Sequence, residues 1–213
     1  MKDLVFVSVS FGPRYIAQQD RLKESILSIY PDANLLFFRD ELPPGAKPFL
    51  ESIYGFKVQA IQKAIDLGYT KILWLDTAII LKDKIDILLD HEMVAVQDDN
   101  LLHGCISKKY AIYSGYTRQE IEGLKIHLIG GSLYYFDFQT SLARNIFNGF
   151  TADEKGGWFG SQEQESAGQL NGHRWDEACM AMTIFHNDHA PVKNLDIKYN
   201  VGDQSIFIKK HFK

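Results

Sequence analysis

A chain of 213 residues with 46% hydrophobic content is long enough to bury a sizeable core, so a single domain is the simplest organisation. The formal net charge of −4 provides no basic face, which argues against nucleic acid and against an anionic membrane surface as partners. Two cysteines are too few for a disulfide framework, as is typical of a reducing compartment, and we expect a cytoplasmic location. No stretch approaches the ~20 apolar residues of a membrane span.

The first half of the chain alternates predicted strands with predicted helices. Runs of apolar, β-branched and aromatic residues predict the strands, and apolar residues at helical spacing predict the helices. A segment that holds three of the six prolines is expected to be a loop. In chain order we expect strand 4–10, helix 16–29, strand 34–38, loop 42–48, helix 56–67 and strand 71–81. This order favours a largely parallel α/β sheet.

The second half is less regular. We expect strand 93–96, a polar turn at 98–100, a loop or short hairpin over 108–125, strand 127–136, helix 138–150, a long loop over 153–172, helix 175–185, and strands 195–201 and 206–208. Gly130 and Gly131 interrupt one of these strands, and their missing side chains allow another group to approach the backbone closely.

Asp76 interrupts the most apolar stretch of the chain, KILWLDTAIIL at 71–81. Such a continuous apolar run predicts a strand that is buried on both faces of a sheet. A carboxylate in that position is costly to bury unless a cation, a metal or a set of donors compensates its lost hydration. Because ligands of open α/β sheets bind at the carboxyl ends of the strands, Asp76 is the leading candidate for a site residue.

Six segments in chain order resemble motifs of the family 8 retaining glycosyltransferases. The central one, WLDTAIILKDKIDILL, resembles the Asp-X-Asp segment of the family. MVAVQDD, IGGSLYYFD, WDEACMAM, LDIKYNV and IFIKKHF resemble its A-V-x-D strand, N-S-G strand, D-Q-D helix start, L-P-x-x-Y-N strand and I-x-H-F ending. The resemblance implies a GT-A-type nucleotide-sugar-binding fold, with a mainly parallel central sheet flanked by helices and a smaller mixed C-terminal part. It also implies one glycosyltransferase domain over 1–213, with a nucleotide-binding half at 1–100 and an acceptor and catalytic half at 101–213.

The reaction implied by the resemblance is transfer of a hexose or deoxyhexose from a UDP-sugar to a glycan hydroxyl, with retention. Mn²⁺ or Mg²⁺ would neutralise the charge of the leaving diphosphate. Asp76 and His211 match the metal-binding positions of the family. Ala78 stands where the second aspartate of the Asp-X-Asp motif is expected, so one protein ligand is missing. Because Mg²⁺ keeps several waters and uses substrate phosphates, we expect metal dependence to persist in a weakened form.

Further donor-binding residues follow from the same resemblance. Lys57 matches a basic residue on the helix before the motif strand, where it would meet the diphosphate or Asp76; the alternative is a solvated helix lysine. The remaining expected donor-binding residues are Ser8, Val9, Ser10, Arg14, Thr77, Ala78, Gly130 and Gly131. The family's acidic residue at the first strand is absent here, which leaves the mode of uridine recognition open.

Asp176 and Glu177 are the expected catalytic residues, because they align with the first two residues of the D-Q-D helix start. In the family this region lies near the donor sugar, where a carboxylate stabilises an oxocarbenium-like transition state or attacks the anomeric carbon. The alternative is purely structural, since acidic residues in the first turn of a helix are favoured by the helix dipole.

Two other functions fit parts of the sequence. With Ala78 in its motif, the chain could be a non-catalytic nucleotide-sugar-binding module. A phosphohydrolase with Asp76 as nucleophile is disfavoured, because such enzymes place the aspartate on the first strand with a second one two residues later. The family continues beyond His211 with a G-x-x-K-P-W segment, so we expect the chain to be one domain of a longer protein. The chain also resembles virus-encoded members of the family, and a viral protein of this kind would be located in the host cytoplasm.

Overall fold

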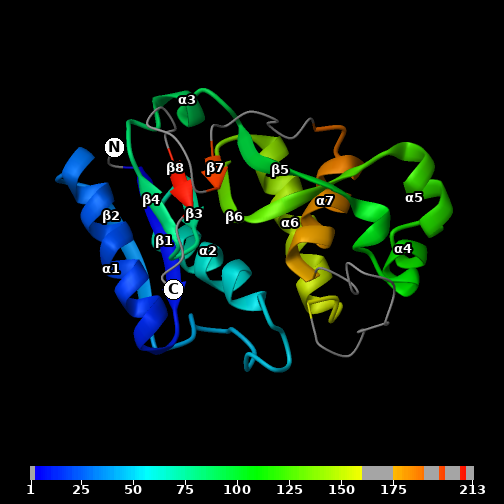
Figure 1. Cartoon of the computed structure of the whole chain (residues 1–213), viewed down its shortest axis with the longest axis horizontal. Helices are drawn as coiled ribbons and strands as arrows, with labels where there is room; N and C mark the ends of the chain where they lie inside the picture. The colour runs from blue at the N-terminus through cyan, green and yellow to red at the C-terminus, as the bar shows by residue number, and fades with distance from the viewer. Residues whose placement is uncertain (1–2, 160–174, 190–196, 200–206, 210–213) are drawn as a thin grey trace.

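The computed structural model describes residues 3–159, 175–189, 197–199 and 207–209. A five-stranded sheet stands at the centre, with helices on both of its faces (Figure 1). The strand order is β2-β1-β3-β6-β5. The strands of this sheet are β1 (Leu4–Ser10), β2 (Asn34–Arg39), β3 (Lys71–Leu75), β5 (Met93–Leu101) and β6 (His127–Asp137).

Four of the five strands run in the same direction. Strand β1 pairs in parallel with β2 and with β3, whereas β6 is antiparallel to both β3 and β5. The register aligns Val7 of β1 with Trp74 of β3, so the carboxyl ends of these two strands meet at the same edge. The predicted α/β class with a mainly parallel central sheet is confirmed.

One face of the sheet is covered by α1 (Gly12–Ile29), α3 (Asp86–Leu89) and β4 (Ile79–Leu81). Helix α1 has a proline in its first turn, where the fixed φ of proline suits a helix start. Leu22 and Ile26, one turn apart on α1, are fully buried and belong to the same core as Leu73 and Leu75 of β3.

The opposite face is covered by α2 (Gly55–Asp66), α6 (Ser141–Lys155) and α7 (Trp175–His186). This larger core also includes residues of α4 (Lys108–Tyr113), α5 (Arg118–Leu124) and the short 3₁₀ helix η1 (Leu102–Gly104). Ile72 and Trp74 of β3 face this core while Leu73 and Leu75 face the other, which confirms that β3 is buried on both faces.

A second, smaller sheet has the order β4-β8-β7, with β7 (Ile197–Tyr199) and β8 (Phe207–Lys209). Strand β8 is antiparallel to β4 and parallel to β7, so this sheet is mixed, as predicted for the C-terminal part. Strands were predicted over 195–201 and 206–208; β7 and β8 lie at these places, and the neighbouring residues lie outside the described part.

Four sequence predictions are wrong in their details. The single strand predicted at 71–81 is two strands, because residues 76–78 form a turn between β3 and β4. Residues 98–100 belong to β5 rather than to a turn, within a stretch of shifted register. The loop predicted over 108–125 contains α4 and α5, whose starts are fixed by Ser107 and by a Thr117–Glu120 capping box. The loop predicted from 153 begins later, because residues 153–155 end α6.

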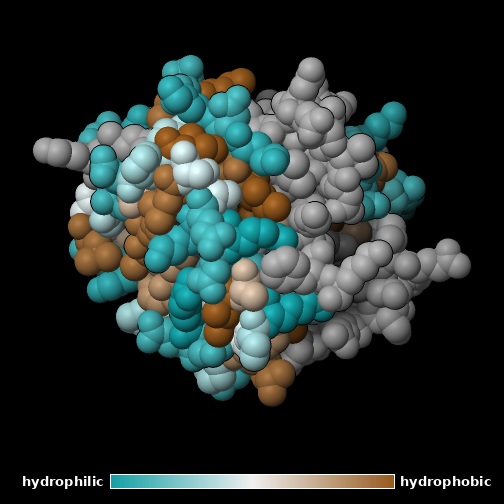
Figure 2. Space-filling view, turned by 60° about the vertical axis from the view of Figure 1, so that its left-hand side comes forward, coloured by the Kyte–Doolittle hydropathy of each residue, from teal (hydrophilic) through white to brown (hydrophobic). Residues whose placement is uncertain are grey.

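The surface of the described part mixes residue types. Figure 2 shows apolar residues interspersed with hydrophilic ones on the face that it presents. Among the described residues, no helix combines the length and the apolar character that crossing a membrane requires. Cys105 and Cys179 are both buried and are not joined in a disulfide, as expected for small core residues.

Candidate active site

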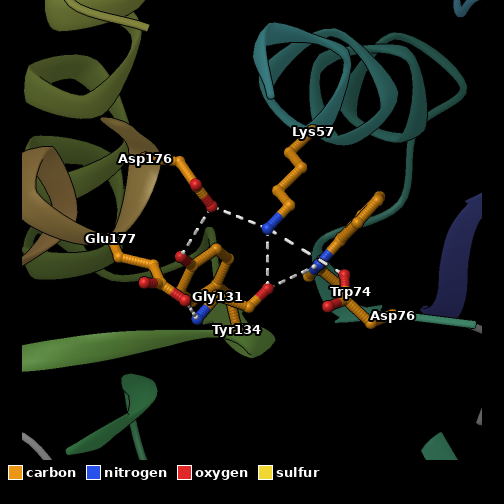
Figure 3. Close-up of polar contacts among 7 residues, drawn as sticks. All are labelled: Lys57, Trp74, Asp76, Gly131, Tyr134, Asp176 and Glu177. Atoms are coloured by element: carbon orange, nitrogen blue, oxygen red, sulfur yellow. Dashed lines mark hydrogen bonds and ion pairs between the residues drawn. The ribbon is translucent and has the colours of Figure 1, made fainter. Parts of the chain in front are cut away.

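The ammonium group of Lys57 is the point at which three elements of the fold meet (Figure 3). Lys57 lies in the first turn of α2, and only 3% of its side chain is exposed. Its Nζ donates hydrogen bonds to Asp176 Oδ2 of α7, at 2.6 Å, and to the Gly131 carbonyl oxygen of β6, at 2.8 Å. Asp76 Oδ1 lies 3.9 Å from the same nitrogen. A solvated helix lysine, the alternative left open by the sequence, is therefore wrong.

Three aromatic rings enclose this ammonium group. Nζ of Lys57 lies 4.9, 5.6 and 5.7 Å from the ring centroids of Tyr54, Trp74 and Tyr134, within the range of cation–π attraction. Trp74 Nε1 also donates to the Gly131 carbonyl oxygen at 3.2 Å, and the Tyr134 hydroxyl donates to Asp176 Oδ2 at 3.3 Å. Sequence reasoning missed these three residues. Of the three, only Trp74 could have been noticed in the sequence, because its indole lies two residues before Asp76.

The missing side chain of Gly131 provides the space in which the Lys57–Asp176 ion pair lies. A Cβ at this position would lie 2.7 Å from Lys57 Nζ and 2.8 Å from Asp176 Oδ2, closer than such atoms can approach. The sequence predicted a close approach to the backbone at Gly130 and Gly131, and at Gly131 the approaching group is the chain's own lysine. Gly130 lies in β6 opposite Val96 of β5.

Asp176 and Glu177 stand in the first turn of α7. Asp176 is 2% exposed and is committed to Lys57, whereas Glu177 is only partly buried and its Oε1 accepts a hydrogen bond from the Gly131 backbone N–H at 3.2 Å. From the first turn of α7, Asp176 therefore bonds Lys57 of α2, and Glu177 bonds the Gly131 backbone of β6. Both carboxylates thus make tertiary contacts in addition to their interaction with the helix dipole.

Charge in this cluster is unevenly balanced. Burial raises the pKa of the Asp176 carboxyl to about 6, although the adjacent Lys57 ammonium opposes this rise. Burial lowers the pKa of Lys57, but the negative charges of Asp176 and Asp76 outweigh burial and raise its pKa overall. The 2.6 Å separation of Lys57 Nζ and Asp176 Oδ2 is that of an ion pair. With Asp76, Asp176 and Glu177 around one lysine, acidic groups outnumber the cation.

Asp76 lies in the turn between β3 and β4, at the carboxyl end of β3. Its backbone N–H donates to the Ser132 carbonyl oxygen of β6 at 2.9 Å, and its own carbonyl accepts from the Ile79 N–H at 3.0 Å. One third of its side chain, 33%, is exposed. This exposure explains how a carboxylate is tolerated after an apolar strand, because water continues to hydrate it.

The other predicted donor-binding residues lie around the same sheet edge. Ser8, Val9 and Ser10 end β1 and are buried, and the Ser8 hydroxyl has no hydrogen-bond partner among the described residues. Thr77 and Ala78 are also buried, in the turn after Asp76. Arg14 is exposed in the first turn of α1.

The positions that the family resemblance assigns to a metal ion are only partly covered by the described residues. In residues 3–159 and 175–189 and the two short C-terminal strands, no three His, Cys, Asp or Glu side chains are grouped to hold a metal ion. Asp76 fits the role of one ligand, because its carboxylate is partly exposed. The buried Ala78 brings no side-chain oxygen, and His211 lies outside the described residues.

Comparisons with known proteins identify the fold. The chain matches no protein-family model and no curated protein. Among solved structures it is similar to a glycosyltransferase involved in the glycosylation of the major capsid of PBCV-1, with a TM-score of 0.55, 11% identity, and coverage of 97% of this chain and 93% of that chain. It is also similar to the apo structure of the bifunctional glycosyltransferase WbbM, with a TM-score of 0.50, 11% identity, and coverage of 96% of this chain but 45% of that chain. The protein therefore has the fold of glycosyltransferases.

Proposed function

We propose that this protein is a glycosyltransferase that moves a hexose or deoxyhexose from a UDP-sugar to a glycan hydroxyl. The observation that carries the proposal is the gathering of Asp76, Asp176 and Glu177 around the buried Lys57, beside the edge where β1 and β3 end. That edge is where open α/β sheets bind their ligands. The fold shared with two glycosyltransferases supports the same conclusion.

The proposed roles follow from exposure and charge. Asp76, with a third of its side chain exposed, faces the donor. The buried Lys57–Asp176 pair is neutral as a whole and fixes the position of Asp76 from behind, so the charge that neutralises the leaving nucleoside diphosphate would come from a bound divalent cation. Glu177 is the more accessible of the two α7 carboxylates, so we assign it, rather than Asp176, to the anomeric carbon.

Retention of configuration is part of the proposal. Glu177 would stabilise an oxocarbenium-like transition state or attack it from the face opposite the diphosphate. In the alternative same-face route, the departing phosphate oxygen takes the proton of the acceptor hydroxyl, and Glu177 contributes only its charge. The assignment to the family 8 type belongs to the same proposal, and it rests on the six motifs.

A divalent cation, Mn²⁺ or Mg²⁺, completes the proposed site. Asp76 and His211 would hold it together with the donor phosphates, and it would supply charge neutralisation at the diphosphate. A competing proposal is a nucleotide-sugar-binding module without catalysis. It is favoured by the buried Ala78, which stands in place of an acidic ligand.

The two proposals are separated by incubating the protein with a panel of UDP-sugars, with and without Mn²⁺, and measuring binding and UDP release. A glycosyltransferase binds one donor and slowly hydrolyses it, and NMR of the freshly released sugar reports the anomeric configuration. A binding module shifts the thermal unfolding temperature without releasing UDP. If no nucleotide sugar binds under any of these conditions, both proposals fail.

A further inference from the structure

One face of α1 contacts the segment that follows Asp76. Three polar residues of the helix, spaced three and four positions apart, lie on this face. Each bonds a different point of the segment: Thr77 Oγ1 donates to Gln18 Oε1 at 3.2 Å, Arg21 Nη2 donates to the Ala78 carbonyl oxygen at 3.3 Å, and the Leu81 N–H donates to Ser25 Oγ at 3.0 Å. Helix α1 therefore bonds both the turn at 76–78 and strand β4.

The turn at 76–78 is bonded on both of its sides. Strand β6 holds it on one side, through the bond from the Asp76 N–H to the Ser132 carbonyl oxygen. On the other side the Thr77 side chain, which is buried, meets Gln18, which is completely buried. The backbone that carries the Asp76 carboxylate is therefore held between β6 and α1.

Gln18 is a polar residue in a completely buried position, where an apolar side chain would fill the core equally well. Its Oε1 accepts from Thr77, but its Nε2 is buried without a hydrogen-bond partner in the part of the chain that the structure describes. An unpaired buried amide nitrogen opposes folding, whereas an apolar side chain of similar shape would carry no such penalty. The amide therefore points to a role in fixing Thr77 rather than in packing.

We infer that Gln18 is a positioning residue, which acts through Thr77 to hold the turn that presents Asp76 to the donor. The effect on the turn is independent of the reaction, while the effect on donor binding rests on the proposed function. The two parts of the inference therefore need two measurements on the same variants.

The variants are Gln18→Met and Thr77→Val, which remove either partner at nearly constant volume, and the double variant. Tyr30→Phe is the matched control, because it removes a different hydrogen bond, from the Ile85 N–H to the Tyr30 hydroxyl at 2.8 Å, which does not involve the turn at 76–78. The first measurement is amide hydrogen exchange by NMR at Asp76, whose N–H bonds the turn to β6, and at Ile79, whose N–H closes the turn. The second is the affinity for UDP with Mn²⁺.

We expect exchange at Asp76 and Ile79 to accelerate roughly 2- to 12-fold in both single variants, as for loss of one hydrogen bond, and to rise no further in the double variant. Tyr30→Phe should lower global stability without this local change. Affinity for UDP should weaken in parallel in the turn variants alone. Unchanged exchange in both single variants overturns the inference, and if Gln18→Met does not fold, Thr77→Val decides it. Wild-type protein that binds no UDP refutes the proposed function instead, and the exchange result still decides whether Gln18 holds the turn.

Discussion

The Lys57 ammonium and the Asp176 carboxylate lie 2.6 Å apart, and both side chains are almost completely buried. The two residues are 119 positions apart in the chain, so the pair ties α2 to the start of α7 across the edge of the sheet. A buried charge that loses its partner is strongly destabilising, which makes this pair a fixed part of the fold. It also places the only described lysine of the site within 3.9 Å of Asp76.

The first prediction concerns this pair. Asp176→Leu should destabilise the protein by about 3–5 kcal/mol, because it leaves the Lys57 ammonium buried without its nearest carboxylate. Adding Lys57→Met should recover part of the loss, since no unpaired charge then remains. Urea unfolding of both single variants and the double variant measures the coupling. Strictly additive losses would show that the two side chains do not interact.

Gly131 offers a test of the close approach. Gly131→Ala places a Cβ where Lys57 Nζ and Asp176 Oδ2 now lie, so we expect lower stability and loss of UDP-sugar hydrolysis. Gly123→Ala in α5 is the control, because a Cβ there meets nothing within 4 Å and should stabilise the helix by roughly 0.5–1 kcal/mol. Thermal unfolding and donor hydrolysis are measured for both. A Gly131→Ala variant as stable and active as wild type would be incompatible with the described geometry.

A buried carboxyl outside the site predicts a pH dependence of stability. Asp153 of α6 accepts hydrogen bonds from the Tyr110 hydroxyl at 2.6 Å and the Thr183 hydroxyl at 3.4 Å. Burial raises its pKa to about 6, against the opposing effect of these hydrogen bonds. The folded state therefore binds this proton more tightly than the unfolded state does. The contribution of Asp153 to stability is greatest below pH ~4 and falls as the pH rises towards about 6.

Asp153→Asn removes this titration. Relative to wild type, the variant should gain on the order of 2 kcal/mol of stability between pH 4 and pH 7.5, from a shift of about two pKa units. Denaturant unfolding at several pH values provides the measurement, with the exposed Asp66→Asn as a control that should track wild type. If the difference between Asp153→Asn and wild type does not change with pH, the carboxyl titrates normally in the folded protein.

Much of the fold could be predicted from local patterns. Apolar runs identified β1, β2, β3, β6 and α7, and helical spacing identified α1 and α2, because each contributes many apolar residues to the core. Helices α4 and α5 were missed because they are short and are fixed by capping hydrogen bonds rather than by a long periodic face. The turn after Asp76 was missed because the apolar run continues through it, while its shape depends on bonds to Ser132 and to α1.

The candidate site was predictable only in part. Asp76 carried its own signal, as a charge that follows four apolar residues. The pairing of Lys57 with Asp176 carries none, because it joins positions that only the fold brings together. The role of Asp176 as the lysine's partner, with Glu177 as the more exposed carboxylate, likewise depends on how α7 meets β6. The aromatic enclosure by Tyr54 and Tyr134 is a tertiary feature of the same kind.

Glu177 is predicted to act in the chemical step. Glu177→Gln keeps an oxygen that can accept the Gly131 N–H but removes the charge. Donor hydrolysis should fall by about 10²- to 10⁴-fold, as for loss of one catalytic group, with UDP affinity unchanged. Glu122→Gln, an exposed change in α5, should leave both quantities at the wild-type level. Full activity of Glu177→Gln would show that Glu177 has no catalytic role and only stabilises the start of α7.

The most direct test of the account is a calorimetric titration of UDP into wild type and Asp76→Asn, each with and without Mn²⁺. The Asp76 side chain is partly exposed, so the substitution should leave the unfolding transition close to that of wild type. We predict that wild type binds UDP in the presence of Mn²⁺ and that Asp76→Asn loses this metal-dependent binding. An Asp76→Asn variant that binds UDP with unchanged affinity in the presence of Mn²⁺ would contradict the assignment of this sheet edge as the donor site.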